Sequence, residues 1–453
     1  MKKIIIISEC FAPNNKIAAI RTTKLAKYFK LKQNYNITVI SRALRNDEIV
    51  DPILSEDLKY VDNHIIVGHS KYMKNLFKIR ERLIKVKHTK IDTTVSASTG
   101  SRRSKKTIRS NLINSRLGLY IRVKFNEIIE DLEQKDFIRL AYRQVGENLD
   151  FDLILSSHDP YSSHMIASKI KRNNPEKLWI ADFRDPVLNP FTPEGKLGFY
   201  KSYIKNVSKN ADVFTGVTKA CLKGFEKQQM KQCYVICNGF DRDDLKNVEI
   251  VSNSQFTLTY TGLLYQGKRD LSIIFKALRE LIEEGNVDGK NVLINYAGRS
   301  ESDFIKQIEK YNLRESSRLH GFVDREQSLQ LQLSSNILLL ASWNNSEDTG
   351  VVTGKFLEYL MMNKPIVCAI TGDLPNSQLK EMIKEANNGV IWEEANDEVD
   401  YPILKSYILE QYQSFMNSQP PLFEPNLEYI EQYNYKNIAQ QFIDIIEKQS
   451  TNA

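Results

Sequence analysis

The sequence predicts an α/β protein with two doubly wound, Rossmann-like domains, each built on a parallel sheet. The chain has 453 residues, which is too long for one ordinary domain, and its 42% hydrophobic residues can fill two cores. Short runs rich in β-branched residues alternate with amphipathic stretches, as βαβ units require. This series starts at the N-terminus and starts again near residue 256, so we expect two sheets rather than one.

The predicted strands are buried runs that end in polar or glycine-containing loops. In the first half they cover residues 3–7, 37–41, 153–157, 178–182, 213–217 and 234–237. In the second half they cover residues 256–260, 292–296, 337–340, 365–369 and 389–392. Residues 43–150 break the rhythm, and there we predict helices over 71–86 and 125–147. The small, polar and basic residues 95–106 between these helices predict a mobile loop.

The join between the domains is expected at residues 238–254, where the loop-forming sequence NGFDRDD precedes a polar stretch. We therefore assign residues 1–240 to an N-terminal domain and residues 241–425 to a C-terminal domain. Residues 426–453 are predicted to add a C-terminal helix that can pack back on the N-terminal domain. Parallel strands present their carboxyl ends at one edge of a sheet, so we expect both edges to face a central cleft.

Cysteine and histidine usage excludes several classes of protein. The cysteines are Cys10, Cys221, Cys233, Cys237 and Cys368. Their odd number and the absence of CxxC spacing argue against a disulfide framework and against a zinc cluster. The six histidines show no paired spacing either, so we expect no metal and no cofactor. The sequence also lacks a Walker A loop, a GxGxxG fingerprint and a nucleophile elbow.

Hydropathy predicts a cytoplasmic protein. No run approaches the roughly 20 apolar residues of a membrane-spanning helix, and residues 4–7 are too few for the core of a signal peptide. The net charge of +7 is unevenly distributed, because residues 71–124 contain sixteen Lys or Arg against only Glu81 and Asp92. This basic insertion fits peripheral contact with the anionic inner face of the plasma membrane, and it also fits a solvated loop. It lacks interleaved aromatic residues, which argues against nucleic acid as a partner.

Three loops of the second half carry groups that suit an anionic ligand. After the run at residues 256–260, Gly262 lets the backbone approach a ligand closely, and Lys268 and Arg269 can neutralise a diphosphate. After the next run, Arg299 follows Gly298 and adds a second cation. Backbone groups of two further loop residues can hydrogen-bond a flat base; they are Phe322 and Val323. An ordinary loop with solvated charges is the alternative for each segment taken alone.

The sequence around residues 346–362 predicts a polar glycine loop that runs into a helix. Thr353 is the expected cap, and the free N–H groups at Gly354 and the residues that follow it suit phosphate oxygens. Glu358 lies one turn beyond Lys355, where a carboxylate can accept both hydroxyls of a ribose. A surface ion pair between these two side chains on a core helix is the alternative.

In the first half, charged residues follow two predicted strands. Asp182, Arg184 and Asp185 stand at the end of one run, and His158 stands at the end of another. Asp182 could orient an acceptor hydroxyl, Arg184 could bind an acceptor phosphate or carboxylate, and His158 could relay a proton. The alternatives are an internal Arg–Asp network and a loop histidine that caps the next helix.

The sequence GKFLEYL at residues 354–360, followed by NKPIV at 363–367, resembles the donor-site helix of glycosyltransferase family 4, a retaining family with the GT-B fold. The first half contains ADFRDP at 181–186, DVFTGVTK at 212–219 and VICNGFD at 235–241, which resemble the acceptor-domain signatures of that family in the same order. The opening CFAP, with Arg21 after it, matches the first loop and helix. The resemblance covers nearly the whole chain outside roughly residues 43–125.

The resemblance implies transfer of a sugar, with retention and without a required metal, from a nucleoside diphosphate sugar. Lys268 or Arg269, together with Arg299, would hold the diphosphate, and Glu358 would bind the ribose. Arg21 and Asp185 would bind the acceptor, which is implied to be a saccharide or a lipid-linked saccharide. The implied role is the biosynthesis of bacterial surface polysaccharide, such as capsule, O-antigen or exopolysaccharide.

Two departures from the family pattern keep other functions open. Gly350 stands where family members commonly carry a glutamate that faces the donor sugar, and Glu347 and Asp348 are nearby but out of register. Residues 14–18 replace the usual glycine pair of the first loop. A GT-B-like nucleotide-sugar epimerase and a non-catalytic scaffold of a polysaccharide assembly complex are therefore the alternatives.

Overall fold

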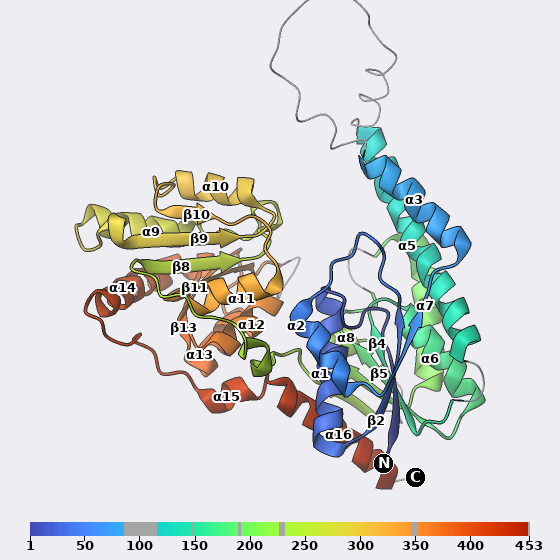
Figure 1. The fold of residues 1–453 in the computed structure, drawn as a ribbon. Coiled ribbons are helices and arrows are strands. Elements are labelled where there is room, and N and C mark those ends of the chain that lie inside the picture. Colours follow the sequence, from blue (N-terminus) through green and yellow to red (C-terminus); the bar gives the residue numbers. More distant parts are fainter. Residues whose placement is uncertain (86–115, 146–148, 189–191, 226–231, 347–351, 452–453) are drawn as a thin grey trace, which may run out of the picture. The chain divides into compact units, whose positions relative to one another are not determined.

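The computed structural model describes residues 1–85, 116–145, 149–188, 192–225, 232–346 and 352–451 (Figure 1). The predicted loop at 95–106, as well as Glu347, Asp348 and Gly350, lies outside these residues. The chain forms two compact units: unit 1 comprises Met1–Val50 and Asp57–Ile236, and unit 2 comprises Asp51–Glu56 and Cys237–Ala453. All five cysteines are free thiols.

Unit 1 contains a seven-stranded, all-parallel sheet in the order β3-β2-β1-β4-β5-β6-β7. Its strands are β1 Lys3–Ile7, β2 Asn36–Arg42, β3 Asn63–Val67, β4 Leu153–His158, β5 Leu178–Phe183, β6 Val213–Gly216 and β7 Gln232–Val235. The order reverses between β1 and β4, which makes the carboxyl ends of these two strands the switch point of the sheet. The edge strand β3 was missed in the sequence, because its side chains are mostly part-exposed and its apolar run is short.

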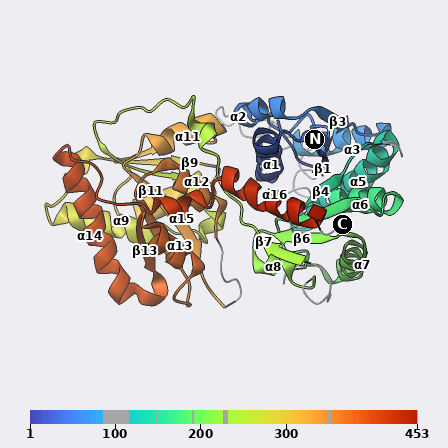
Figure 2. The same cartoon turned by 90° about the horizontal axis from the view of Figure 1, so that it is seen from below.

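Helices cover both faces of this sheet. They are α1 Ile17–Gln33, α3 Lys71–Lys85, α5 Arg116–Val145, α6 Ser162–Asn173, α7 Glu194–Asn210 and α8 Lys219–Leu222. Helices α5, α6 and α7 share one core with the sheet, where Phe137, Ile166 and Trp179 are buried, and α1 covers the other face (Figure 1). The short α8 contacts β6 and β7 at the far edge (Figure 2). The helix predicted over 125–147 begins earlier, at Arg116.

Unit 2 repeats the doubly wound plan with a six-stranded parallel sheet, order β10-β9-β8-β11-β12-β13. Its strands are β8 Phe256–Thr261, β9 Val292–Ala297, β10 Ser317–Leu319, β11 Ile337–Trp343, β12 Ile366–Thr371 and β13 Gly389–Glu393. The switch point lies between β8 and β11. The two sheets confirm the predicted α/β class with two doubly wound parallel-sheet domains.

The helices of unit 2 form two layers. They are α2 Pro52–Ser55, α9 Ser272–Glu283, α10 Glu301–Glu309, α11 Arg325–Leu333, α12 Gly354–Met362, α13 Gln378–Ala386, α14 Asp397–Met416, α15 Leu427–Glu431 and α16 Tyr435–Thr451. Helices α9, α10 and α14 share one core with the sheet, and α11, α12 and α13 share the core on the opposite face. None of the helices in the described part of the chain combines the length and apolar character needed to cross a bilayer.

The C-terminal segment contains two helices where the sequence predicted one. The break between α15 and α16 carries backbone hydrogen bonds to Phe240, whose N–H donates to Tyr433 and whose carbonyl accepts from Tyr435, at 2.9 and 2.8 Å. Gly239 passes so close that a Cβ there would lie 2.0 Å from the Tyr433 carbonyl oxygen. The NGF turn at residues 238–240 therefore fixes the break between the two helices.

A buried ion pair connects α1 to the centre of the unit 1 sheet. Arg21 donates through Nε and Nη2 to the two carboxylate oxygens of Asp182, both at 2.9 Å, and the side chains are 1% and 0% exposed. Nη2 also donates to the Ile236 carbonyl at 2.9 Å. Thr215 and Ser157 donate their hydroxyls to Asp182 at 2.7 and 3.2 Å. The carboxylate is thus fully satisfied inside the protein.

We expect Arg21→Ala to destabilise unit 1 by about 3–5 kcal/mol, because the Asp182 carboxylate would remain buried without its cation. Urea unfolding followed by far-UV circular dichroism measures the change. The matched control is Lys135→Ala, which removes an exposed i, i+4 pair with Asp131 and should cost no more than about 0.5 kcal/mol. A loss below about 1 kcal/mol for Arg21→Ala would show that the pair is dispensable.

Candidate functional site

The three loops that follow β8, β9 and β10 are joined by backbone contacts into one surface. The Gly262 N–H donates to the Ala297 carbonyl, and the Gly298 N–H donates to the Gly321 carbonyl, both at 2.8 Å. A Cβ on Gly298 would lie 2.1 Å from the Gly262 carbonyl oxygen, so glycine is required at this crossing. Gly262 and Gly321 have φ values of 136° and 69°, which other residues rarely adopt. The predicted glycines therefore bring the three loops together.

The loop after β8 turns sharply before its two cations. Three consecutive residues have positive φ: Tyr265 at 49°, Gln266 at 59° and Gly267 at 85°. Positive φ is sterically unfavourable for Tyr265 and Gln266, and the turn is held by hydrogen bonds from the Gly267 and Arg269 N–H groups to the Leu264 carbonyl, at 3.0 and 3.1 Å. The turn places Lys268 and Arg269 at the carboxyl edge of the sheet, beside the end of β11.

Two aromatic rings accompany these cations. The Arg269 guanidinium lies 4.5 Å from the ring centroid of Tyr265 and 5.9 Å from that of Trp343, and the Lys268 ammonium lies 5.8 Å from Trp343. Arg269 donates to the Leu263 carbonyl at 3.3 Å, while its buried Nε has no acceptor among the described residues. Trp343 is the last residue of β11, at the switch point of the sheet. This position at a strand end is the sequence signal from which its place in the site could have been predicted.

The Arg299 guanidinium stacks on the ring of Phe322. Both residues were assigned to one ligand site from the sequence. The guanidinium lies 4.1 Å from the centroid of the Phe322 ring, which is 54% exposed. The interaction joins the loop after β9 to the loop after β10 and leaves both side chains at the surface. Val323 follows in the same loop and is part-exposed. The predicted backbone groups are therefore next to a cation and an open aromatic face.

Helix α12 begins where the sequence predicted. The Thr353 hydroxyl accepts a hydrogen bond from the Phe356 N–H at 3.2 Å, as an N-cap does. Gly354 is exposed, and among the described residues no atom outside its own helix and chain neighbours lies within 4 Å of the position of a Cβ there. Phe356, Tyr359 and other apolar side chains of α12 are buried and fix the direction of the helix. The N-terminal N–H groups of α12 are therefore not covered by other elements in the described part of the chain.

Glu358 is the centre of a hydrogen-bonded group at this helix start. One carboxylate oxygen, Oε1, accepts from Lys355 Nζ and from Gln332 Nε2, both at 2.7 Å. The same Gln332 nitrogen lies 3.0 Å from the Thr261 hydroxyl at the end of β8, and the Lys355 side chain passes 3.8 Å from the Cβ position of Gly262. The Lys355 and Glu358 side chains are 27% and 20% exposed. The ion pair therefore closes against the β8 loop and remains accessible.

The carboxylate of Glu358 is held in its charged form. Burial alone would raise its pKa, but the charges of Lys355 and Arg325, with the hydrogen bonds from Lys355 and Gln332, lower the pKa below its ordinary value. Arg325 is itself fixed by Asp244 and Asp51, at 2.6 and 3.3 Å. Neither Arg325 nor Gln332 was predicted from the sequence, because both lie on α11, away from the recognised motif.

Unit 2 therefore gathers three cations and a carboxylate at one switch point. The cations Lys268, Arg269 and Arg299 and the N-terminal N–H groups of α12 suit a polyanion such as a diphosphate. Glu358 presents a charged acceptor that suits a pair of hydroxyl groups. All the residues predicted for the donor site thus belong to the loops or the helix at the carboxyl edge of this one sheet.

The candidate residues of unit 1 differ in their access to solvent. Arg21 and Asp182 satisfy each other in the interior, so neither side chain reaches an acceptor in this structure. Arg184 is part-exposed; it donates through Nε to Ser157 at 3.2 Å and contacts the Asp159 carbonyl. Asp185 is exposed. Only the last two therefore present polar groups at the surface.

His158 is buried at the end of β4. Its Nδ1 lies 3.0 Å from the Tyr203 hydroxyl. Burial lowers the pKa of His158 well below its ordinary value, and the nearby His164 and Arg184 lower it further, so the ring is neutral near pH 7. A ring with so low a pKa resists protonation near pH 7, and the Tyr203 hydroxyl, which lies within hydrogen-bond distance of Nδ1, sets its orientation.

We expect the stability that Glu358 contributes to depend on pH with a defined sign. Its pKa is lower in the folded chain than the ordinary value of 4.5, so its contribution is fully present above pH 4.5 and is lost as pH falls through the folded pKa. Urea unfolding of wild type and Glu358→Gln from about pH 3 to about pH 7 measures this, with surface variant Glu381→Gln as control. A wild-type advantage that grows as the pH falls would contradict the assignment.

Comparisons with known proteins agree with the two-unit architecture. No protein-family model matches the sequence, and no curated protein matches it. The structure is similar to sucrose-phosphate synthase (tll1590) from Thermosynechococcus elongatus, with a TM-score of 0.57 and 12% identity over 100% of both chains. It is also similar to α,α-trehalose 6-phosphate synthase from Burkholderia multivorans, with a TM-score of 0.55 and 10% identity over 100% of both chains.

A third similar structure is S. aureus TarM in complex with α-GlcNAc-glycerol and UDP, with a TM-score of 0.54 and 12% identity. The similarity covers 98% of this chain and 99% of TarM. These neighbours are GT-B glycosyltransferases, which agrees with the resemblance seen in the sequence. At this level of identity the similarity establishes the fold, and the chain has the GT-B fold.

Proposed function

We propose that this protein transfers a sugar, with retention, from a nucleoside diphosphate sugar to a saccharide or lipid-linked acceptor. The observation that carries the proposal is Glu358, a charged and accessible carboxylate one turn into α12. It lies at the switch point of a sheet whose neighbouring loops carry Lys268, Arg269 and Arg299. The GT-B fold and the sequence resemblance to glycosyltransferase family 4 support the same assignment.

The proposed donor contacts follow from the chemistry of the groups. The diphosphate oxygens accept from the N–H groups at the start of α12 and from Lys355, Lys268 or Arg269, whose Nε lacks an acceptor among the described residues. The two ribose hydroxyls donate to Glu358. The base lies against the loop of Phe322 and Val323.

The proposed chemistry depends on charge that develops on the leaving diphosphate. Fixed cations and helix N–H groups stabilise that charge in the transition state without reorganising. Neither this step nor the resemblance requires a metal. Arg184 and Asp185 are the proposed acceptor-side residues of unit 1. Asp182, which fixes Arg21, and His158, which is buried, act without touching the acceptor.

The proposal extends to surface polysaccharide and to an anionic membrane. A lipid-linked acceptor requires the enzyme to approach a bilayer, and the described start of α3 exposes Lys71, Lys74 and Lys78 together with Tyr72 and Ile79. Basic and apolar side chains on one exposed segment suit an anionic lipid surface, where each cation contributes up to about 1 kcal/mol.

We expect the chain to bind one of UDP, GDP, ADP or CMP, or a sugar conjugate of one of them, without added metal. Isothermal titration calorimetry measures the affinities. Glu358→Ala should weaken nucleoside diphosphate binding by about 1–3 kcal/mol, because two buried hydrogen bonds to the ribose are lost. Glu381→Ala, which removes an exposed carboxylate from α13, is the matched control and should leave the affinity unchanged.

The outcomes separate the candidate functions. Binding of no nucleotide would overturn the donor site and favour a non-catalytic scaffold. Conversion of a free nucleotide sugar without any acceptor would instead show an epimerase. Unchanged affinity in Glu358→Ala, with binding retained by the wild type, would overturn only the role of Glu358.

We expect deletion of residues 95–106 to lower association with anionic vesicles while nucleotide binding stays intact. The reason is electrostatic, since the segment contains Arg102, Arg103, Lys105 and Lys106 and no acidic residue. Cosedimentation with phosphatidylglycerol vesicles at low salt measures the effect. Equal vesicle binding by the deletion variant would remove this segment from the proposal.

A further inference from the structure

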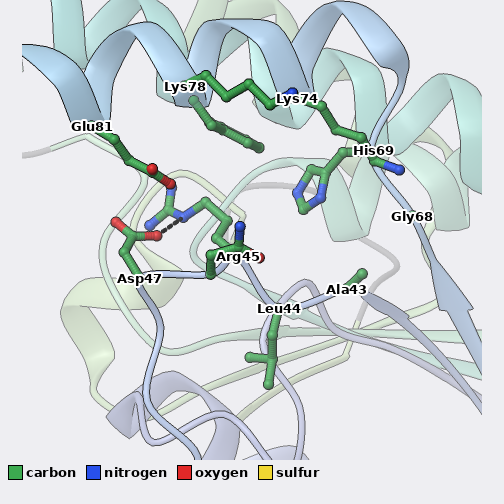
Figure 3. Close-up of a pocket in the computed structure, with 11 residues that line it drawn as sticks. Ala43, Leu44, Arg45, Asp47, Gly68, His69, Lys74, Lys78 and Glu81 are labelled. Atoms are coloured by element: carbon green, nitrogen blue, oxygen red, sulfur yellow. Dashed lines mark ion pairs between the residues drawn. The ribbon is translucent and has the colours of Figure 1, made fainter.

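A pocket of about 360 Å³ lies at the carboxyl edge of the unit 1 sheet, and none of its residues was predicted from the sequence to bind the donor or the acceptor. Its walls are the loop after β2, the loop after β3 and one face of α3 (Figure 3). The side chains that determine its chemistry are Arg45, Asp47, His69, Lys74, Lys78 and Glu81. The pocket therefore sits on the sheet edge where doubly wound domains bind ligands.

The floor of the pocket is held by a buried charge network. Arg45 and His69 both contact the Glu133 carboxylate, at 2.9 and 3.0 Å, and Arg42 lies 3.2 Å from the same group. The Arg45 and His69 side chains are only 12% and 9% exposed. Glu133 accepts the hydrogen of His69 Nε2, which fixes the orientation of the ring. The floor is thus fixed before any ligand arrives.

An aromatic side chain completes the wall beside this floor. Phe77 packs edge-on against His69, with ring centroids 4.9 Å apart, and the Arg45 guanidinium lies 5.8 Å from its centroid. Figure 3 shows Arg45 and His69 beneath α3, with Asp47 and Glu81 toward the same end of the pocket. The Arg45 guanidinium therefore lies at the acidic end of the pocket, where it pairs with Asp47 at 3.4 Å, and Phe77 forms the wall beside it.

Two lysines of α3 are available to a ligand. Lys74 and Lys78 line the pocket one turn apart, are exposed, and make no ion pair within the described part of the chain. Like charges at positions i and i+4 of a helix repel each other, so an anion bound between Lys74 and Lys78 relieves their repulsion. The neighbouring basic residues behave differently, because Arg45 and Arg80 both pair with Asp47, at 3.4 and 3.8 Å.

We propose that this pocket binds a phosphate monoester group carried by the acceptor. The two lysines bind the phosphate oxygens, Phe77 packs against the sugar or chain that carries the phosphate, and Glu81 accepts from its hydroxyls. The identification of this ligand as the acceptor rests on the proposed glycosyl transfer, whereas phosphate binding itself does not. A phosphorylated soluble saccharide and a lipid phosphate present the same chemistry to the pocket.

The test measures glucose 6-phosphate, inorganic phosphate and glucose by ligand-observed NMR relaxation with the full chain. We expect both phosphates to bind and glucose not to bind. In the variant with Lys74→Ala and Lys78→Ala the dissociation constant for glucose 6-phosphate should rise at least about tenfold, since two charge-assisted contacts are lost. Lys71→Ala removes an exposed charge from the same helix outside the pocket, and should change the dissociation constant for glucose 6-phosphate less than about twofold.

A third variant distinguishes phosphate binding in this pocket from phosphate binding at the carboxyl edge of the unit 2 sheet. Arg269→Ala should leave the affinity for glucose 6-phosphate unchanged if the pocket is the site. Equal affinity in the wild type and the double lysine variant would overturn the proposal, and so would a loss in Lys71→Ala as large as in the double variant. Failure to bind any nucleotide would remove the acceptor assignment but leave the phosphate result standing.

The source of the phosphate is decided with vesicles. Phosphatidylcholine vesicles that contain a phosphatidic acid are compared with pure phosphatidylcholine for wild type, the double lysine variant and Lys71→Ala. A loss confined to the double variant supports a lipid phosphate as the ligand. Equal losses in the double variant and in Lys71→Ala, with binding of glucose 6-phosphate retained, support a soluble saccharide phosphate.

Discussion

Parallel strands joined by helices all end at the same edge of their sheet, and this constraint decides where charge can be used in the molecule. Both units follow it, with the order reversing between β1 and β4 in one and between β8 and β11 in the other. The strands themselves are filled with buried apolar residues, so polar side chains collect just beyond their carboxyl ends. The candidate donor residues and the new pocket both lie at such edges.

The two edges use their charges differently. Unit 1 contains internal charges, as in the Arg21–Asp182 pair and the network of Arg42, Glu48 and Glu133, where burial is offset by several partners for each group. In unit 2 the cations lie at the surface against aromatic rings, as Arg299 does against Phe322.

The sequence predicted the architecture well, because buried parallel strands are read as continuous apolar runs. It failed at β3, whose mostly part-exposed edge strand lacks such a run, and at the break before α16, which depends on backbone contacts with Phe240. Thr353 and Glu358 were predicted from the capping rules and the family motif. Gln332 and the pocket at Lys74 were not, since each depends on segments that only the fold brings together. Trp343 was missed although it ends β11 at the switch point. Residue type alone also suggested a ligand for Asp182, whereas the fold buries it against Arg21.

The assignment of Asp51–Glu56 to unit 2 means that the chain passes between the units at three places rather than one. Asp51 contributes directly, because it caps α2 through the Leu54 N–H and pairs with Arg325. Cutting the gene near codon 236 would therefore not yield two self-sufficient halves. The downstream half would lack one of the two carboxylates that neutralise Arg325, and the upstream half would carry a short foreign helix with Leu54 uncovered. In evolutionary terms, the two units of this chain are not independently exchangeable modules.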